Sequence, residues 1–128
     1  MGRIKSYRDL VVWQKSMDLV DACYALTSRF PPAERFGITS QIRRSAVSIA
    51  ANIAEGHARN GPREFVHHLS IARGSLRELE TLLIVSQRQR YIPATTFVEV
   101  ERQTDQIGRM LSVLHSRIAV RSRSQQPP

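Results

Sequence analysis

The residues of this chain that could carry out chemistry are a Glu–His pair, a single cysteine and many arginines. Glu64 and His67 have the i, i+3 spacing with which helices of carboxylate-bridged di-iron bundles present two metal ligands together. Such a centre needs a second copy of the pair and two further inward glutamates, and the sequence contains no second copy. Cys23 lies in an apolar stretch without a neighbouring histidine, as a small core residue would. We therefore expect a protein that is not an enzyme, with no metal and no cofactor, and a bundle metalloenzyme is the least favoured alternative.

Arginine dominates the charge of the chain. Nineteen Lys and Arg face eleven Asp and Glu for a net charge of +8, and all basic residues except Lys5 and Lys15 are arginines. Residues 29–77 hold eight arginines and three glutamates, hence a net +5. The guanidinium group suits bidentate contacts with phosphate. The localised surplus indicates an anionic partner, of which nucleic acid is the commonest, whereas the bland alternative is charge that only keeps the protein in solution.

Six arginines in or beside the predicted second and third helices are the candidate nucleic-acid-binding residues. They are Arg43, Arg44, Arg59, Arg63, Arg73 and Arg77. The few aromatic residues fit core positions, so stacking platforms for unpaired bases are not expected. Binding to RNA or DNA would then be mainly to the phosphates and would weaken steeply with salt.

The elements that must position these residues are helices. Four stretches place apolar residues at alternating spacings of three and four, and none alternates as a strand does. The expected helices cover about residues 10–30, 39–58, 62–90 and 93–119. The linkers between them are short, which favours an all-α, up-down-up-down antiparallel four-helix bundle.

The limits of the first helix and of the domain can also be predicted. Asp9 is the expected N-cap and Pro31-Pro32 the expected stop. The main apolar seam of this helix would comprise Leu10, Trp13, Met17, Val20, Tyr24 and Thr27. The residues expected to widen this seam are Leu19, Cys23, Leu26 and Phe30. Residues 1–119 form the predicted bundle domain, and residues 120–128 a disordered basic tail. The apolar runs reach only four or five residues and no signal peptide is visible, so we expect a cytoplasmic protein without a membrane span.

The predicted second helix carries a polar line beside its apolar one, and its other residues are mostly small. Gly74-Ser75 of the third helix would offer a matching shallow spot, whereas Gly56 and Gly61 fit signals that end helices. The polar line could join an internal hydrogen-bond network with Ser75 and an arginine, form part of a subunit contact, or face solvent. The residues assigned to helix packing or to a subunit interface are Ser48, Asn52, Glu55, Gly74, Ser75 and Glu78.

Several separated motifs resemble one known family. They include YRDLVVWQK at residues 7–15, QIRRSA at 41–46, NIAEG at 52–56 and IARGSLRE at 71–78. In this order they resemble the small bacterial four-helix-bundle proteins first noticed as reading frames inside intervening sequences of 23S ribosomal RNA genes, once mislabelled as a ribosomal protein. That family is similar in fold to the accessory variability determinant of diversity-generating retroelements.

The resemblance implies a bacterial cytosolic bundle that assembles as a homopentamer, which favours the subunit-contact interpretation of the polar line. The retroelement relative binds nucleic acid and its reverse transcriptase through a basic surface, and the matching positions here are Arg43, Arg44, Arg73 and Arg77. We therefore expect a non-enzymatic homo-oligomeric scaffold that binds nucleic acid. The alternative is an adaptor for an acidic protein partner that does not bind nucleic acid.

Overall fold

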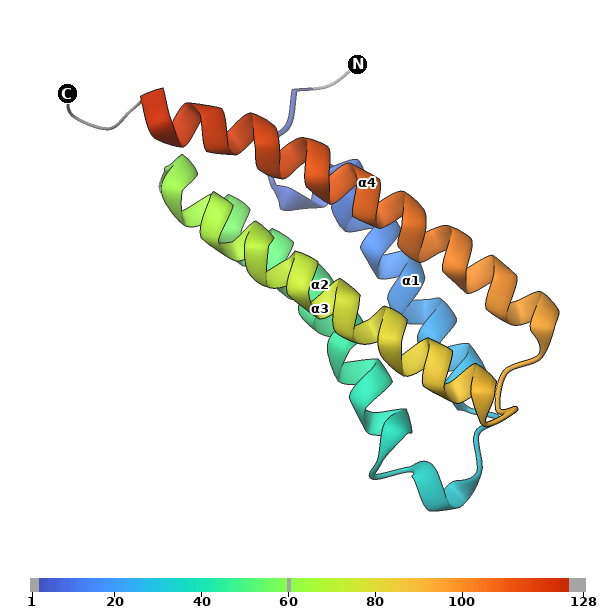
Figure 1. The fold of residues 1–128 in the computed structure, drawn as a ribbon. Coiled ribbons are helices and arrows are strands. Elements are labelled where there is room, and N and C mark those ends of the chain that lie inside the picture. The colour runs from blue at the N-terminus through green and yellow to red at the C-terminus, as the bar shows by residue number, and fades with distance from the viewer. Residues whose placement is uncertain (1–2, 60, 125–128) are drawn as a thin grey trace.

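Four long helices account for most of the residues that the structure describes. The computed structural model describes residues 3–59 and 61–124, and no strand occurs in these two segments. Its elements are the short 3-10 helices η1 (Tyr7–Asp9) and η2 (Pro32–Glu34) and the α-helices α1 (Val11–Thr27), α2 (Ile38–Ala58), α3 (Pro62–Arg88) and α4 (Ala94–Ser124). Successive helices run antiparallel, so that α1 begins and α4 ends at the same end of the bundle (Figure 1). The predicted four-helix bundle is confirmed.

The helices are arranged so that each one packs against two others. α2 lies against α1 and α3, while α4 lies against α1 and α3. One core runs along the axis, and all four helices contribute to it. Its most deeply buried side chains are Leu19 and Cys23 of α1, Ile42, Ile49 and Ile53 of α2, Leu69, Leu76 and Leu79 of α3, and Val100, Ile107 and Leu111 of α4.

Met17 and Tyr24 of the predicted apolar seam of α1 lie outside the core, whereas the residues expected to widen that seam form its centre. Met17 and Tyr24 are 38% and 44% exposed, whereas Leu19 and Cys23 are fully buried. Both stripes have the same alternation of three and four, so periodicity alone could not choose between them. The buried stripe also contains Ser16, whose hydroxyl is satisfied inside the core because it donates to the Val12 carbonyl oxygen at 2.7 Å.

Asp9 also has a different role from the predicted one. It ends η1, and its carboxylate accepts hydrogen bonds from the backbone N–H groups of Lys5 (2.8 Å) and Ser6 (3.2 Å). These two bonds lower the pKa of Asp9, since they stabilise the ionised carboxylate. The N-cap of α1 is Leu10, which makes no side-chain cap bond. Asp9 therefore orders the segment before α1 and does not cap it.

α4 continues beyond the predicted end of the bundle domain. It reaches Ser124, so that residues 120–124 of the predicted disordered tail are helical, while residues 125–128 lie outside the described part of the chain. Arg121 and Arg123 occupy its last turn, where positive charge interacts favourably with the helix dipole. The Ser124 hydroxyl donates to the Arg121 carbonyl oxygen at 2.9 Å.

Glycine sets the distance between α2 and α3. Gly56 lies within α2 and is not a terminator: a Cβ added there would lie 2.6 Å from His68 Cβ and 3.1 Å from Phe65 Cδ1. Gly74 is exposed on α3, and a Cβ there would meet nothing within 4 Å. Gly56 therefore occupies the close approach that Gly74 was expected to provide, and Gly61 (φ 98°) is the N-cap of α3.

These two glycines predict opposite effects of the same substitution. Gly56→Ala should lower the free energy of unfolding by about 1–3 kcal/mol, because the methyl group overpacks a rigid contact between helix backbones. Gly74→Ala should raise it by about 0.5–1 kcal/mol, because alanine is the better helix former at an exposed position. Urea denaturation followed by circular dichroism measures both. Destabilisation by Gly74→Ala would show instead that another chain packs at this glycine.

Candidate nucleic-acid interface

A basic groove lies where the end of α1 meets the start of α2. It has a volume of about 440 Å³ and is lined by Tyr24, Arg35, Phe36, Thr39, Ser40, Arg43, Arg44 and Val47. Three arginines thus surround it, and no carboxylate does among the described residues. Neither Arg35 nor Arg44 is in an ion pair with any described residue. The charge of this groove is therefore free to interact with an anion.

Arg43 is held in place on one wall of this groove. Its Nε donates to Thr27 Oγ1 at 2.9 Å, and its guanidinium carbon lies 4.5 Å from the centre of the Tyr24 ring. This cation–π contact explains why Tyr24 stays on the surface, since its ring covers a cation and not the core. Arg43 therefore links α2 to the end of α1 and presents its charge in a fixed position.

A buried hydroxyl without a partner also lines the groove. Thr39 is 7% exposed, and its Oγ1 makes no hydrogen bond to any described residue. Leaving a buried hydroxyl unsatisfied is unfavourable by about 1–3 kcal/mol.

The six predicted arginines do not form one surface within the chain. Arg43 and Arg44 lie at the α1–α2 edge, while Arg59 and Arg63 lie at the other end of α2, beside the turn into α3. Arg59 donates to Glu55 Oε1 at 2.9 Å, and this hydrogen bond is the main reason why the pKa of Glu55 is lowered and that of Arg59 raised. Another edge carries the remaining two arginines.

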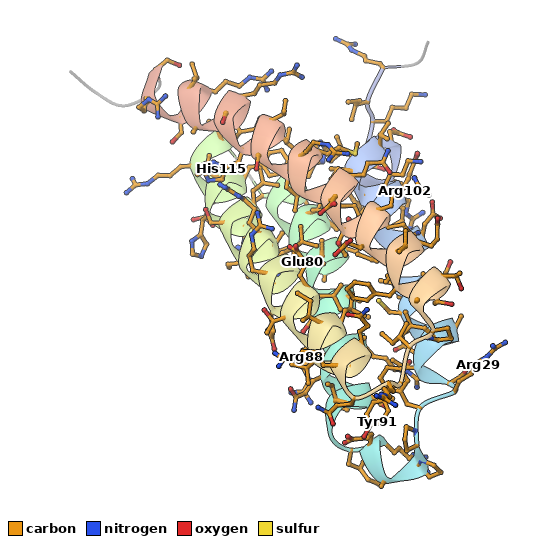
Figure 2. All side chains as sticks on the ribbon, turned by 45° about the vertical axis from the view of Figure 1, so that its right-hand side comes forward. Arg29, Glu80, Arg88, Tyr91, Arg102 and His115 are labelled. Atoms are coloured by element: carbon orange, nitrogen blue, oxygen red, sulfur yellow. The ribbon has the colours of Figure 1, made fainter. Side chains whose placement is uncertain are left out.

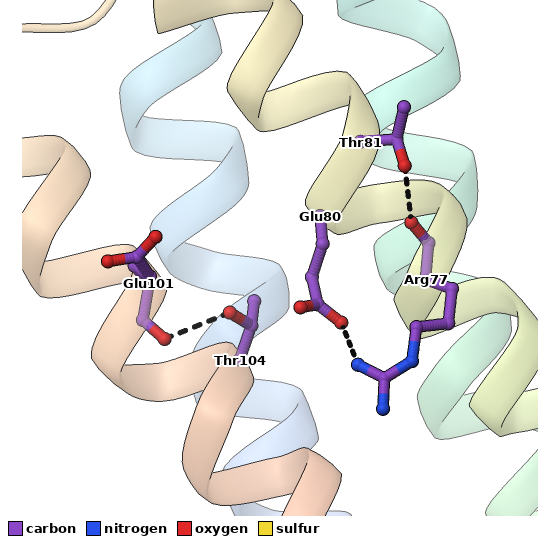
Figure 3. Close-up of polar contacts among 5 residues, drawn as sticks. All are labelled: Arg77, Glu80, Thr81, Glu101 and Thr104. Carbon is purple, nitrogen blue, oxygen red and sulfur yellow. Dashed lines mark hydrogen bonds and ion pairs between the residues drawn. The ribbon is translucent and has the colours of Figure 1, made fainter.

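Arg73 and Arg77 belong to the α3–α4 edge of the bundle. His115 lies on α4 (Figure 2), and its pKa is lowered first by burial and then by the charge of Arg73. Its Nε2 lies 3.1 Å from Ser70 Oγ. Arg77 donates to Glu80 Oε1 at 2.6 Å, and Glu80 extends toward α4 (Figure 3). α2 packs between α1 and α3, and α3 packs between α2 and α4, so Arg73 and Arg77 lie at a different edge of the bundle from the groove.

Ser48 and Asn52 of the predicted polar line take part in a hydrogen-bond network between α2 and α3. Ser48 Oγ lies 2.8 Å from Ser75 Oγ, and Asn52 Nδ2 donates to the Ser48 carbonyl oxygen at 2.9 Å. With its amide nitrogen engaged, Asn52 accepts through Oδ1 from His68 Nδ1 at 3.1 Å. Asn52 and Ser75 thus belong to one network, as the internal interpretation expected. Ser48 and His68 complete it in place of the expected Glu55 and arginine, and the sequence analysis missed His68.

The other residues assigned to packing or to a subunit interface stay outside this network. Glu55 pairs with Arg59 on the surface, and Gly74 and Glu78 are exposed. Their expected role in a subunit contact stays a prediction.

The remaining chemical candidates lie apart from the groove. Burial raises the pKa of the Cys23 thiol to about 12, so that it stays protonated at neutral pH and is a poor nucleophile. Glu64 and His67 are both exposed. Within residues 3–59 and 61–124, no group of three or more His, Cys, Asp or Glu side chains could hold a metal ion. No helix in these segments is long and apolar enough to cross a bilayer.

Comparison with known proteins now places the chain. Residues 8–113 match the family described as 23S rRNA-intervening sequence protein. The chain belongs to this family. A similar solved structure is that of a protein of unknown function from the S23 ribosomal protein family of Bacteroides thetaiotaomicron VPI-5482. It is 26% identical, superposes with a TM-score of 0.77, and the match covers 82% of this chain and 98% of that one. No curated protein matches the sequence.

The match to this family covers every element that lines the groove. The sequence analysis had identified only some of the residues that line it. Arg35 and Phe36 were overlooked, and Tyr24 was assigned to the core. Phe36 is 89% exposed in the short segment between η2 and α2. An available signal was its position between Arg35 and Gly37, in a linker and not in a helical stripe.

The polar network predicts a measurable contribution to stability. Asn52→Ala should lower the free energy of unfolding by about 1–3 kcal/mol, because His68 Nδ1 and Ser48 lose a partner in a part-buried contact. Ser70→Ala removes an exposed hydrogen bond to His115 and should change it by less than about 0.5 kcal/mol. The midpoint of urea denaturation measures both variants. Equal effects would mean that the network between α2 and α3 contributes no more than a surface contact.

Proposed function

We propose that the protein is a cytoplasmic, non-enzymatic scaffold that self-associates and binds nucleic acid through the groove at Arg35, Arg43 and Arg44. The observation that carries this proposal is the groove itself, which three arginines line without a carboxylate. Guanidinium groups bind phosphate strongly and bidentately. The resemblance to a nucleic-acid-binding relative supports the same assignment for Arg43 and Arg44.

Self-association would bring the separate basic regions to one ligand. The outer face of α2 and α3 offers an apolar and small-residue surface, with Val47 43% and Ile71 40% exposed. The Ser48–Ser75 contact sets the register that brings Val47 and Ala51 of α2 level with Gly74 and Ile71 of α3. If copies join through this face, the grooves repeat around the assembly and the arginines of the α3–α4 edge can contact the same strand. Repetition also raises the overall affinity through multivalency.

Binding should depend on the arginines of the groove and on salt. Arg35→Glu with Arg44→Glu should weaken binding of duplex DNA at least 10-fold, because two groups that contact phosphate become carboxylates that repel it. Each phosphate contact also contributes about −0.9 to the slope of log affinity against log salt. That slope should become shallower by about 2. Fluorescence anisotropy across a salt series gives both quantities. Arg43 is left intact because it also joins α2 to α1.

The matched control reverses two exposed charges on α4, Arg109→Glu with Arg117→Glu. It changes the net charge equally and should alter the affinity less than about 3-fold. Equal losses in the two double variants would refute the groove as the site. If the unchanged protein binds neither DNA nor RNA at low salt, the groove serves an acidic protein partner and the adaptor alternative replaces this proposal.

Self-association has its own test. Multi-angle light scattering should give a mass several times 14.6 kDa for the unchanged protein, with five copies expected from the family resemblance. Ala51→Glu places a charge on the outer face of α2 and should reduce the mass, whereas Val113→Glu on α4, also exposed, should not. A monomeric unchanged protein would overturn this part of the proposal. A mass that Ala51→Glu leaves unaltered would place the contact on another face.

A further inference from the structure

Phe36 is the most exposed of the large apolar side chains in the described chain, at 89%. Its exposure is not the result of a loose terminus, since the backbone on both sides of it is hydrogen-bonded. The Gly37 N–H donates to the Glu34 carbonyl oxygen at 3.0 Å, and the Gln41 N–H of the first α2 turn donates to the Gly37 carbonyl oxygen at 3.1 Å. The fold thus holds an aromatic ring in solvent at a defined place.

A third contact fixes the segment from the side. The Tyr91 hydroxyl donates to Glu34 Oε2 at 3.0 Å, and this bond raises the pKa of Tyr91, because the carboxylate stabilises the protonated phenol. Tyr91 precedes α4 and lies at the same end of the bundle as η2 (Figure 2). The segment that carries Phe36 is therefore tied to the loop between α3 and α4.

Aromatic rings and cations alternate along this groove. The guanidinium carbon of Arg35 lies 5.3 Å from the centre of the Phe36 ring, and Arg43 lies over Tyr24. Arg44 lines the same groove and offers a further cation. Its volume of about 440 Å³ falls within the range of about 300–1,000 Å³ typical of pockets for small ligands.

This combination fits an unpaired nucleotide better than a duplex. A duplex presents phosphates on its outside but keeps its base faces stacked inside, where a protruding ring cannot reach them. A single strand presents both a phosphate and the face of a base, and proteins that bind single strands combine a basic groove with aromatic rings. Phosphate binding alone gives no reason for an exposed Phe36.

We infer that the groove binds single-stranded nucleic acid, with an unpaired base stacked on Phe36 and its phosphate held by Arg44. This inference rests on the proposed nucleic-acid binding and names the class of nucleic acid that the site takes. It corrects the sequence-based expectation that no stacking platform exists. Arg35, which already lies against one face of Phe36, would become part of the same stack.

The test compares ligands that have equal phosphates and different bases. Three ligands of equal length are used: a single-stranded oligonucleotide, an abasic strand and a duplex. The unchanged protein should bind the single strand more tightly than the abasic strand. Phe36→Ala should weaken binding of the single strand about 5- to 100-fold and leave the other two ligands unaffected. Phe36→Tyr should restore binding, whereas Val98→Ala, at another exposed apolar residue on α4, should change nothing.

A spectroscopic measurement separates stacking from other roles of Phe36. 2-Aminopurine within the strand should be quenched by the unchanged protein and by Phe36→Tyr, but not by Phe36→Ala. Equal affinity for the normal and abasic strands, or no effect of Phe36→Ala, would overturn the inference while phosphate binding stands. Absence of binding to all three ligands at low salt would overturn the proposed function as well. A lower assembly mass of Phe36→Ala would assign the ring to a subunit contact and refute the inference.

Discussion

The close approach of α2 and α3 at Gly56 is the constraint on which the rest of the structure depends. Only a glycine leaves room for the His68 side chain at this point, and at that helix separation the side chains of Ser48, Asn52, His68 and Ser75 come within hydrogen-bonding reach. These contacts fix the rotation of both helices about their axes as well as their separation. α1 and α4 then pack onto a pair whose apolar sides already face the bundle axis. The position of Arg43 and Arg44 at the α1–α2 edge follows from this rotation, because they lie on the same helix as Gly56.

The buried face of a helix was predicted correctly where the sequence of that helix contains a single line of apolar residues. α3 has one apolar line, from Phe65 to Leu83, and its members are all buried. α1 has two neighbouring lines of equal quality, and its true core line includes Ser16, a polar residue that satisfies itself by bonding to its own helix. Periodicity reports which residues of a helix are apolar and not which residues they contact. It therefore could not reveal that the Tyr24 ring packs against the Arg43 guanidinium. For the same reason Gly56 resembled a helix terminator, because its packing partner lies in the next helix.

The candidate site was predictable in charge but not in arrangement. A count of charges located the basic surplus between residues 29 and 77, and Arg43 and Arg44 were among its members. Whether an arginine is free depends on what surrounds it in space: Arg77 is engaged by Glu80 across one turn, and Arg59 by Glu55. Arg35 and Phe36 were overlooked because they lie in a linker, where no helical period assigns a direction to a side chain. The linker contributes Arg35 and Phe36 to the groove and packs against α2.

The hydrogen bond between Tyr91 and Glu34 has a consequence for how the groove would work. Residues far apart in the sequence meet there, so the linker with Phe36 is already ordered before any ligand arrives, and little conformational entropy remains to be lost on binding. Through the same bond, the order of the linker that carries Phe36 depends on the turn between α3 and α4. Fraying of that end of the bundle would release the Phe36 ring without unfolding the core, since the most deeply buried residues lie within the four helices. A loss of order in the α3–α4 turn would therefore reach the groove through this one hydrogen bond.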